Sequence, residues 1–312
     1  MSKQRNRSNI VFADPTVDFV FKKIFGTKEY SSATIDLINS FIEGINVQSV
    51  EFLNTVQDKE SKNERTTIVD VLAKDDKGNH FIIEMQNAGH YYFRERMMYY
   101  ASKVISKLKD LEKTDEKKSK KQKNKRKFNY DIKGTYVIAI LNFNLDFYEK
   151  DDDFESTIIH YRTTNVDTGK KMPASPEYIF LQLRKSDKVV ENVNEFQKKW
   201  LTLLRNSKHM KEVPQEFADD PGAAAYFKAS LYANLKADKQ LEYDRIMDTK
   251  YDIEDSLLDA ELKGEAKGIA KGMAKGETKK QLEIAKAMKA DGVDTNIIAK
   301  YTGMSEEQIK AL

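Results

Sequence analysis

Apolar residues recur at helical spacing near the start of the chain and predict two amphipathic helices, over residues 14–26 and 31–43. Asp14 and Pro15 are residues that favour a helix N-terminus, and Gly26 is a residue that can end a helix. The apolar face of the first predicted helix consists of Val17, Phe21 and Ile24.

Beyond these helices the pattern changes to short runs rich in β-branched and aromatic residues. The runs at 66–75 and 79–86 are joined by the turn sequence DKG, which predicts a β-hairpin. A helix is predicted next, over about 90–111, and the chain becomes helical again from 189. The remaining strands are predicted within 47–57, 134–145, 156–164 and 177–185.

This order of elements predicts an α/β fold with a mixed sheet and flanking helices, followed by a helical C-terminal region. We expect the sheet domain to occupy residues 1–185 and a helical region to follow at 186–255. Residues 256–312 are expected to form a Lys/Gly-rich helix and a small tail that resembles a helix-turn-helix.

Two features of this tail allow alternative interpretations. Its four glycines, spaced four residues apart, indicate either a lysine-rich connecting helix or close helix pairing in a homo-oligomer. The last two predicted helices could bind DNA or serve as an interaction module, and the glutamates near 306 are unfavourable for contact with phosphates. The residues expected to form the small core of the tail are Ile297, Ile298, Ile309 and Leu312.

The composition of the chain excludes several classes of protein. The chain has no cysteine, which excludes disulfides and thiol catalysis and is typical of the reducing cytoplasm. No apolar run approaches the ~20 residues of a membrane span, so we expect a cytoplasmic protein without membrane contact. The net charge is only +3, but residues 117–127 contain eight Lys and Arg, a cluster suited to contact with phosphates.

The predicted hairpin contains polar residues where an apolar face is expected. Glu84 and Gln86 are two residues apart and therefore share one face of their strand. If the turn is centred on Lys77, Asp70 lies opposite Glu84 on the partner strand. Two carboxylates among apolar residues repel each other and are costly to bury, and a divalent cation such as Mg²⁺ or Mn²⁺ would relieve both costs.

The strand sequences VDV and IIEMQ, followed by the helix sequence RERMMYYASKV, resemble the PD-(D/E)XK nuclease superfamily. The resemblance is closest to the PD-(D/E)XK nuclease family transposases, which are related to the Rpn recombination-promoting nucleases. The opening DPTVDFVFKKIFG and the lysine- and glycine-rich tail are also similar to this family.

The resemblance implies a restriction-endonuclease-like core and metal-dependent hydrolysis of DNA phosphodiester bonds, in transposition or recombination. It assigns Asp70, Glu84 and Gln86 to catalysis, and Asp70, Glu84 and the Met85 backbone carbonyl to the metal. Gln86 stands where the superfamily usually has lysine. An amide can position a water molecule but supplies no positive charge.

The helix after the strand carries Arg96, Tyr100, Lys103 and Lys107 on one face, and we expect these side chains to contact DNA phosphates. Tyr100 has an alternative place in the core with Met97 and Val104. Arg96 could instead pair with an acidic neighbour. Asp18 and Lys22 of the first helix are candidate accessory residues.

Two other hypotheses remain. An RNase H-like transposase would use Asp70, Asp146 and a helical glutamate, but gives the Glu84–Gln86 pair no role. A catalytically silent DNA-binding or assembly protein of a mobile element would use the basic segment and the tail instead.

Overall fold

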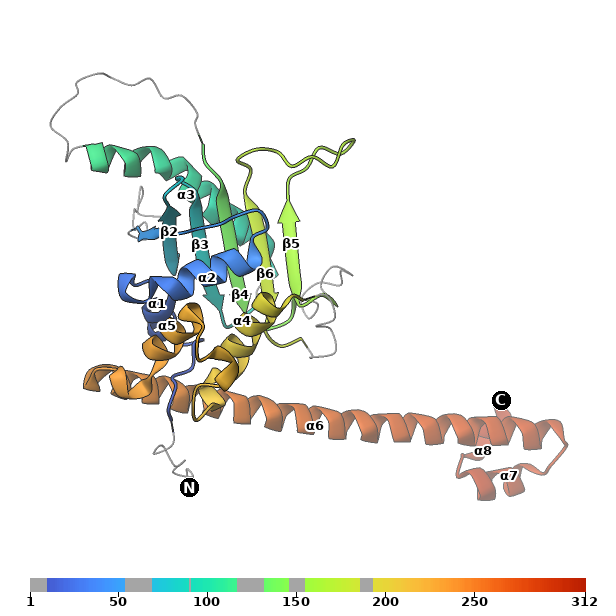
Figure 1. Ribbon diagram of the computed structural model, residues 1–312. Helices are drawn as coiled ribbons and strands as arrows, with labels where there is room; N and C mark the ends of the chain where they lie inside the picture. The colour runs from blue at the N-terminus through green and yellow to red at the C-terminus, as the bar shows by residue number, and fades with distance from the viewer. Residues whose placement is uncertain (1–9, 54–68, 90, 117–131, 146–154, 186–192) are drawn as a thin grey trace, which may run out of the picture. The chain divides into compact units, whose positions relative to one another are not determined.

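The computed structural model describes residues 10–53, 69–89, 91–116, 132–145, 155–185 and 193–312 (Figure 1). The chain divides into two compact units, Met1–Gln240 and Leu241–Leu312. The division into three regions that we expect from the sequence stays a prediction.

A six-stranded mixed sheet forms the centre of the first unit, with the strand order β1-β2-β3-β4-β6-β5. β4 pairs in parallel with both β3 and β6, and the other three pairings are antiparallel. Every residue of β4 is buried, as expected for a central strand that is covered on both faces. The strands are β1 (Val50–Phe52), β2 (Val71–Asp75), β3 (His80–Gln86), β4 (Thr135–Leu141), β5 (Ile158–Arg162) and β6 (Glu177–Gln182).

The β2–β3 hairpin has the register expected from the sequence. Val71 lies opposite Ile83 and Lys74 opposite His80, so the pairing is centred on residue 77. The Asp75 carboxylate closes the turn by accepting hydrogen bonds from the backbone N–H of Lys77 at 2.9 Å and of Asn79 at 2.7 Å. Gly78 has φ +85°, a conformation that favours glycine, and so the turn sequence itself sets the register.

Helices cover the two faces of the sheet. α3 (Phe93–Glu116) packs its apolar side, which includes Phe93, Met97 and Val104, against one face. α1 (Asp18–Phe25) and α2 (Ser31–Phe41) lie on the opposite face (Figure 1). The sequence therefore predicted the α/β class and the mixed sheet correctly.

The expected N-terminus of the first helix is wrong. α1 begins at Asp18, whereas Asp14 is fully buried before it. The Asp14 carboxylate accepts hydrogen bonds from the backbone N–H and the hydroxyl of Thr16, at 2.9 and 2.8 Å, and pairs with Lys208 at 3.1 Å. Asp14 thus shapes the segment that leads into α1, and a residue far along the chain balances its charge.

α4 (Glu195–Asn206) and α5 (Pro221–Ser230) join α2 through a buried lysine. The ammonium group of Lys199 lies 2.5 Å from Asp36 of α2 and 2.6 Å from Asp220, which caps α5. Trp200 Nε1 donates a further hydrogen bond to Asp36 at 2.7 Å. At Gly222 a Cβ would lie 2.6 Å from the Asp36 Cβ, so the close approach of α5 to α2 requires glycine there.

The second unit contains most of α6 (Ala237–Ala290), together with α7 (Thr295–Thr302) and α8 (Glu306–Lys310). Its small core consists of Ala285, Ile298 and Ile309, with Leu312 partly buried against them. Ile297 is 47% exposed, so its predicted place in this core is wrong. The Asp294 side chain caps α7, and Ile297 lies one position before the buried Ile298 in this helix. The two isoleucines therefore point to different sides of α7.

The four glycines of α6, Gly264, Gly268, Gly272 and Gly276, lie within a continuous helix. Apart from the neighbouring residues of α6 itself, no described atom lies within 4 Å of the position that a Cβ would take at any of them. Helix pairing along these glycines therefore stays a prediction. None of the helices that the structure describes is long and apolar enough to span a membrane.

The lysine that joins α2, α4 and α5 gives a prediction for stability. We expect Lys199→Ala to lower the free energy of unfolding by about 2–4 kcal/mol, because two partly buried carboxylates lose their shared cation. The fluorescence of Trp200, the single tryptophan, reports unfolding of this unit during urea titration. Lys198→Ala, at an exposed position of the same helix, is the control and should change the value by less than about 0.5 kcal/mol. Equal effects of the two substitutions would contradict a structural role for Lys199.

Candidate active site

The open end of the β2–β3 hairpin brings two carboxylates together. Asp70 immediately precedes β2, and the register that pairs Val71 with Ile83 places Asp70 opposite Glu84 of β3. The backbone N–H of Asp70 donates to Glu84 Oε1 at 3.0 Å. The backbone N–H of Met85 donates to Asp70 Oδ2, also at 3.0 Å. Side chains thus replace the next pair of ladder hydrogen bonds, and each carboxylate is fixed by the backbone of the other strand.

Burial makes this pair electrostatically costly. Glu84 is only 2% exposed, and burial together with the neighbouring Asp70 carboxylate raises its pKa to about 8. Burial also raises the pKa of Asp70, although the hydrogen bond from Met85 and the charge of Lys22 oppose the shift. A bound cation would favour the ionised form of both groups. Two converging carboxylates with little solvent are oxygen ligands that suit a divalent metal ion.

The backbone carbonyl of Met85 faces the same side as Asp70. Gln86 O accepts a hydrogen bond from Asn142 N at 2.9 Å, so the backbone polar groups of Gln86 face β4. Alternation along the strand directs the N–H and C=O of Met85 toward the β2 side, in agreement with the bond from Met85 N to Asp70. The Met85 carbonyl therefore lies on the side of β3 where a metal ligand is expected.

Gln86 links the carboxylates to a cation. Its amide nitrogen donates to Glu84 Oε2 at 2.8 Å, and its amide oxygen accepts a hydrogen bond from the guanidinium of Arg96. An amide is suited to this position because it has a donor and an acceptor, whereas lysine has donors only. Arg96 Nε is buried and has no acceptor among the described residues. The chain from Arg96 through Gln86 to Glu84 brings positive charge to the site.

Lys22 supplies a second cation from α1. Its ammonium group lies 3.5 Å from Asp70 Oδ1 and 2.6 Å from Asp18 Oδ1. Partial burial disfavours the charged form, but the hydrogen bond to Asp18 and the two carboxylate charges raise the pKa of Lys22 above its ordinary value. The sequence named both Asp18 and Lys22 as accessory candidates. The structure places Lys22 between the two aspartates.

The predicted phosphate-binding face of α3 extends away from the carboxylates. Tyr100 is half-buried, and burial raises the pKa of its hydroxyl; the Arg96 charge opposes this shift, whereas Glu84 and Asp70 add to it. The Lys103 ammonium lies 5.6 Å from the centre of the Tyr99 ring. Lys103 and Lys107 lie about 10 and 16 Å beyond Arg96 along the helix axis, given a rise of 1.5 Å per residue. Their contact with DNA stays a prediction.

Within the described parts of the chain, no group of three or more Asp, Glu and His side chains could hold a metal ion. A metal ion held by Asp70 and Glu84 would therefore need backbone, solvent or substrate oxygens to complete its coordination. Asp146 of the RNase H-like hypothesis and the basic segment 117–127 lie outside the described residues.

The sequence analysis did not identify a network of amide side chains beside the carboxylates. Asn87, directly after β3, donates to the carbonyl of Thr16 at 2.7 Å and accepts a hydrogen bond from Asn142 Nδ2 at 3.2 Å. Asn142 follows β4 in the same way and accepts a bond from Arg184 Nε at 3.3 Å. Polar residues that directly follow buried strands are the signal that could have identified both asparagines, because such residues lie at the carboxyl edge of the sheet.

The fold and this constellation define a nuclease-type α/β protein. A family model described as PD-(D/E)XK nuclease family transposase matches residues 15–260, and the chain therefore belongs to this family. A second model, the C-terminal HTH domain of the Rpn/YhgA-like nuclease family, matches residues 278–312. No curated protein and no solved structure matches the chain. PD-(D/E)XK nucleases generally use divalent metal ions, in keeping with the two carboxylates.

The raised pKa of Glu84 predicts how stability depends on pH in metal-free protein. Between about pH 4.5, the pKa of an unfolded glutamate, and about pH 8, the folded state holds a proton that the unfolded state releases. The free energy of unfolding should therefore fall as pH rises through this window, by up to about 1.4 kcal/mol per pH unit from Glu84.

Urea titrations in EDTA, followed by Trp200 fluorescence, measure this slope at several pH values. Glu84→Gln keeps the shape of the side chain but cannot ionise, so the variant should have a smaller slope. A slope that is equal in the variant and the wild type would show that Glu84 titrates normally.

Proposed function

We propose that this protein is a metal-dependent DNA endonuclease that hydrolyses phosphodiester bonds with Mg²⁺ or Mn²⁺. The observation that carries the proposal is the close pair of the partly buried Asp70 and the buried Glu84, each of which accepts a hydrogen bond at 3.0 Å from the backbone of the other's strand. Two adjacent carboxylates with little access to solvent destabilise a fold unless a cation joins them. Membership of the PD-(D/E)XK family supports the same chemistry.

In the proposed mechanism Asp70, Glu84 and the Met85 carbonyl would hold the metal ion. A bound ion would supply Lewis-acid chemistry, which activates water for attack and offsets negative charge on the phosphate. Gln86 holds Glu84 in place and positions the attacking water through its amide group. The burial of Glu84 keeps these polar groups in an environment where hydrogen bonds are stronger than in water.

Lys22 and Arg96 would supply the positive charge that the motif lysine supplies elsewhere in the superfamily. Arg96 bonds directly to Gln86, and Lys22 lies 3.5 Å from Asp70 Oδ1. Both cations approach from helices that pack on the sheet, so their positions are fixed before substrate binds. We propose that they stabilise the additional negative charge of the phosphate in the transition state.

The proposed substrate is DNA in transposition or recombination. Tyr100, Lys103 and Lys107 would follow the DNA backbone along α3, and the C-terminal HTH domain supports DNA binding. The first turn of α8 contains Glu306 and Glu307, so we propose that contacts with phosphates come from other parts of this unit. Pairing of α6 helices in a homo-oligomer and a cytoplasmic location are part of the same proposal.

The alternative function is a catalytically silent DNA-binding or assembly protein. Gln86 favours this alternative, because the amide lacks the charge of the usual lysine. The hydrogen bond between Gln86 and Arg96 weakens that argument, because it holds a cation next to the Gln86 amide.

Cleavage of supercoiled plasmid in Mg²⁺, Mn²⁺ or EDTA tests the proposed function. We expect wild-type protein to nick the plasmid only with a divalent ion. Asp70→Ala and Glu84→Ala should each reduce the rate about 1,000-fold or more, because they remove ligands of an ion that contributes several kcal/mol to catalysis.

Controls separate the competing hypotheses. Both variants should retain DNA binding, and Asp146→Ala should cleave like wild type. Loss of cleavage with Asp146→Ala, together with normal cleavage by Glu84→Ala, would favour the RNase H-like mechanism. DNA binding without cleavage by wild-type protein would favour the silent protein.

Replacing Gln86 with the lysine that is usual in the superfamily should not make cleavage faster. In Gln86→Lys the Arg96 guanidinium loses its acceptor and faces a second cation, so we expect slower cleavage and a lower melting temperature. Gln86→Glu provides the matched comparison, because it keeps an acceptor for Arg96 but repels Glu84. Faster cleavage by Gln86→Lys at unchanged melting temperature would show that Arg96 does not replace the lysine.

A further inference from the structure

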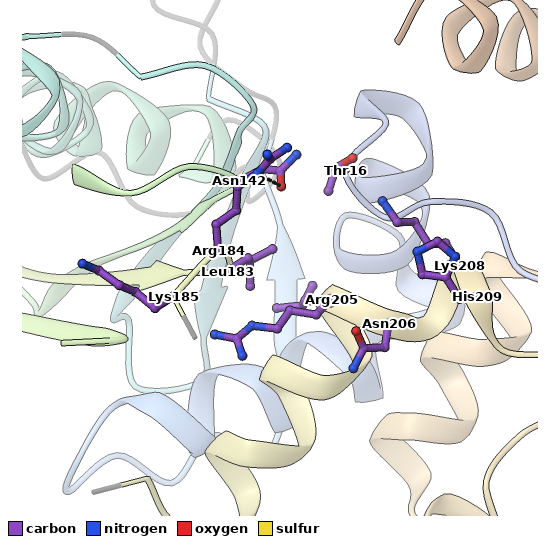
Figure 2. Close-up of a pocket in the computed structure, with 10 residues that line it drawn as sticks. Thr16, Asn142, Leu183, Arg184, Lys185, Arg205, Asn206, Lys208 and His209 are labelled. Carbon is purple, nitrogen blue, oxygen red and sulfur yellow. Dashed lines mark hydrogen bonds between the residues drawn. The ribbon is translucent and has the colours of Figure 1, made fainter. Parts of the chain in front are cut away.

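A polar cavity lies at the carboxyl edge of the sheet, next to the carboxylate site. Its volume is about 440 Å³, and its walls come from the segments after β4 and β6, from the end of α4 and from Thr16 before α1. Figure 2 shows Asn142 and Arg184 on one side, Thr16, Lys208 and His209 on the other, and Arg205 and Asn206 between them.

The lining of this cavity is basic. Its ionisable side chains are Arg184, Lys185, Arg205, Lys208 and His209, and no Asp or Glu among the residues that the structure describes belongs to the lining. The buried Asp14 carboxylate behind the wall offsets the charge of Lys208 at 3.1 Å. Arg184 Nε donates to Asn142 Oδ1 at 3.3 Å, and the Arg205 guanidinium donates to the Gln182 carbonyl at 3.3 Å. Both of these acceptors are neutral.

Asn142 joins the cavity to the carboxylate site. Its backbone N–H donates to the carbonyl of Gln86 at 2.9 Å, and its side chain bonds to both Asn87 and Arg184. Thr16, on the opposite wall, accepts the hydrogen bond from Asn87 through its carbonyl. The same short segment after β3 thus borders the catalytic residues on one side and the basic cavity on the other.

We infer that this cavity binds a phosphate group of the DNA strand that is cut, either an internal phosphodiester or a 5′-terminal phosphate. The inference rests on the proposed function and assigns Arg184 and Arg205 as the binding residues. Arginine donates in a planar fork that matches phosphate oxygens, and Asn142 and Thr16 add neutral polar groups. The volume exceeds the size of one phosphate, so the sugar of the same nucleotide has room beside it.

This subsite would fix the register of the strand. Asn142 donates its backbone N–H to the Gln86 carbonyl, so a phosphate held beside Asn142 lies at the same edge of the sheet as the proposed metal ligands. Contacts of this kind position the backbone but carry no sequence information. The proposal therefore predicts a contribution to DNA affinity that does not depend on the base sequence.

Fluorescence anisotropy of a labelled duplex with full-length protein in EDTA tests the inference without cleavage. We expect Arg184→Ala and Arg205→Ala each to weaken binding about 3- to 10-fold. The slope of log affinity against log salt should become shallower by roughly 0.9 for each lost phosphate contact. Arg162→Ala is the matched control, because this arginine also lies at the end of a strand but does not line the cavity, and it should change neither quantity.

Duplexes in which single phosphates are neutralised or removed identify which phosphate the cavity binds. Methylphosphonate is placed at one position of the duplex at a time, and a second set of duplexes lacks the 5′-phosphate. One of these changes should weaken binding by the wild type but have no further effect on Arg184→Ala. An internal methylphosphonate with this behaviour identifies a phosphodiester, and removal of the 5′-phosphate identifies the terminal group. Unchanged affinity and salt dependence in both arginine variants would overturn the inference.

The binding assay also separates this inference from the proposed function. If wild-type protein binds DNA through Arg184 but never cleaves it, the phosphate subsite is supported and the nuclease function is refuted. If the wild type cleaves DNA and both arginine variants bind normally, the nuclease function is supported and the subsite is refuted. Thermal unfolding followed by Trp200 fluorescence verifies that each variant is folded, and Arg184→Lys, which keeps the charge, should retain the salt dependence of the wild type.

Discussion

The exchange of hydrogen bonds at the open end of the β2–β3 hairpin is the constraint on which the site depends. Asp70 and Glu84 each accept from the backbone of the other's strand, so neither carboxylate can turn toward solvent without losing a bond. The protein thereby holds two acidic groups together with little access to solvent, and the electrostatic cost of ionising both is evident in their raised pKa values. That cost makes the site receptive to a cation.

The surrounding cations are arranged to limit this cost without removing it. Gln86 bonds to both Arg96 and Glu84 and so holds the Arg96 charge near Glu84, and Lys22 is shared between Asp18 and Asp70. Neither cation forms a close, exclusive ion pair with Glu84, whose pKa remains near 8. A direct ion pair would neutralise the carboxylates and compete with a metal ion, whereas a bond relayed by an amide leaves them able to bind one.

The helices on the α1 and α2 face build the basic cavity at this edge of the sheet. Lys199 joins α4 and α5 to α2, and the end of α4 and the turn after it carry Arg205 and Lys208 to the segments that follow β4 and β6. Asp14, buried beneath Lys208, fixes the segment that includes Thr16. Packing of helices from distant parts of the chain thus builds a basic wall next to the carboxylates.

The sequence by itself determined the local features of this protein. The alternation of apolar residues and the DKG turn were sufficient to place Asp70 opposite Glu84, because the period of a strand is two and the turn fixes the register. The tertiary structure decided which cations reach these carboxylates and where the basic cavity forms. Asp14 matched a helix N-cap in sequence, but its partner Lys208 is 194 residues away, and no local pattern reveals such a contact. The positions of Lys22, Asn142, Arg184 and Arg205 likewise depend on packing between separate elements, which only the folded chain specifies.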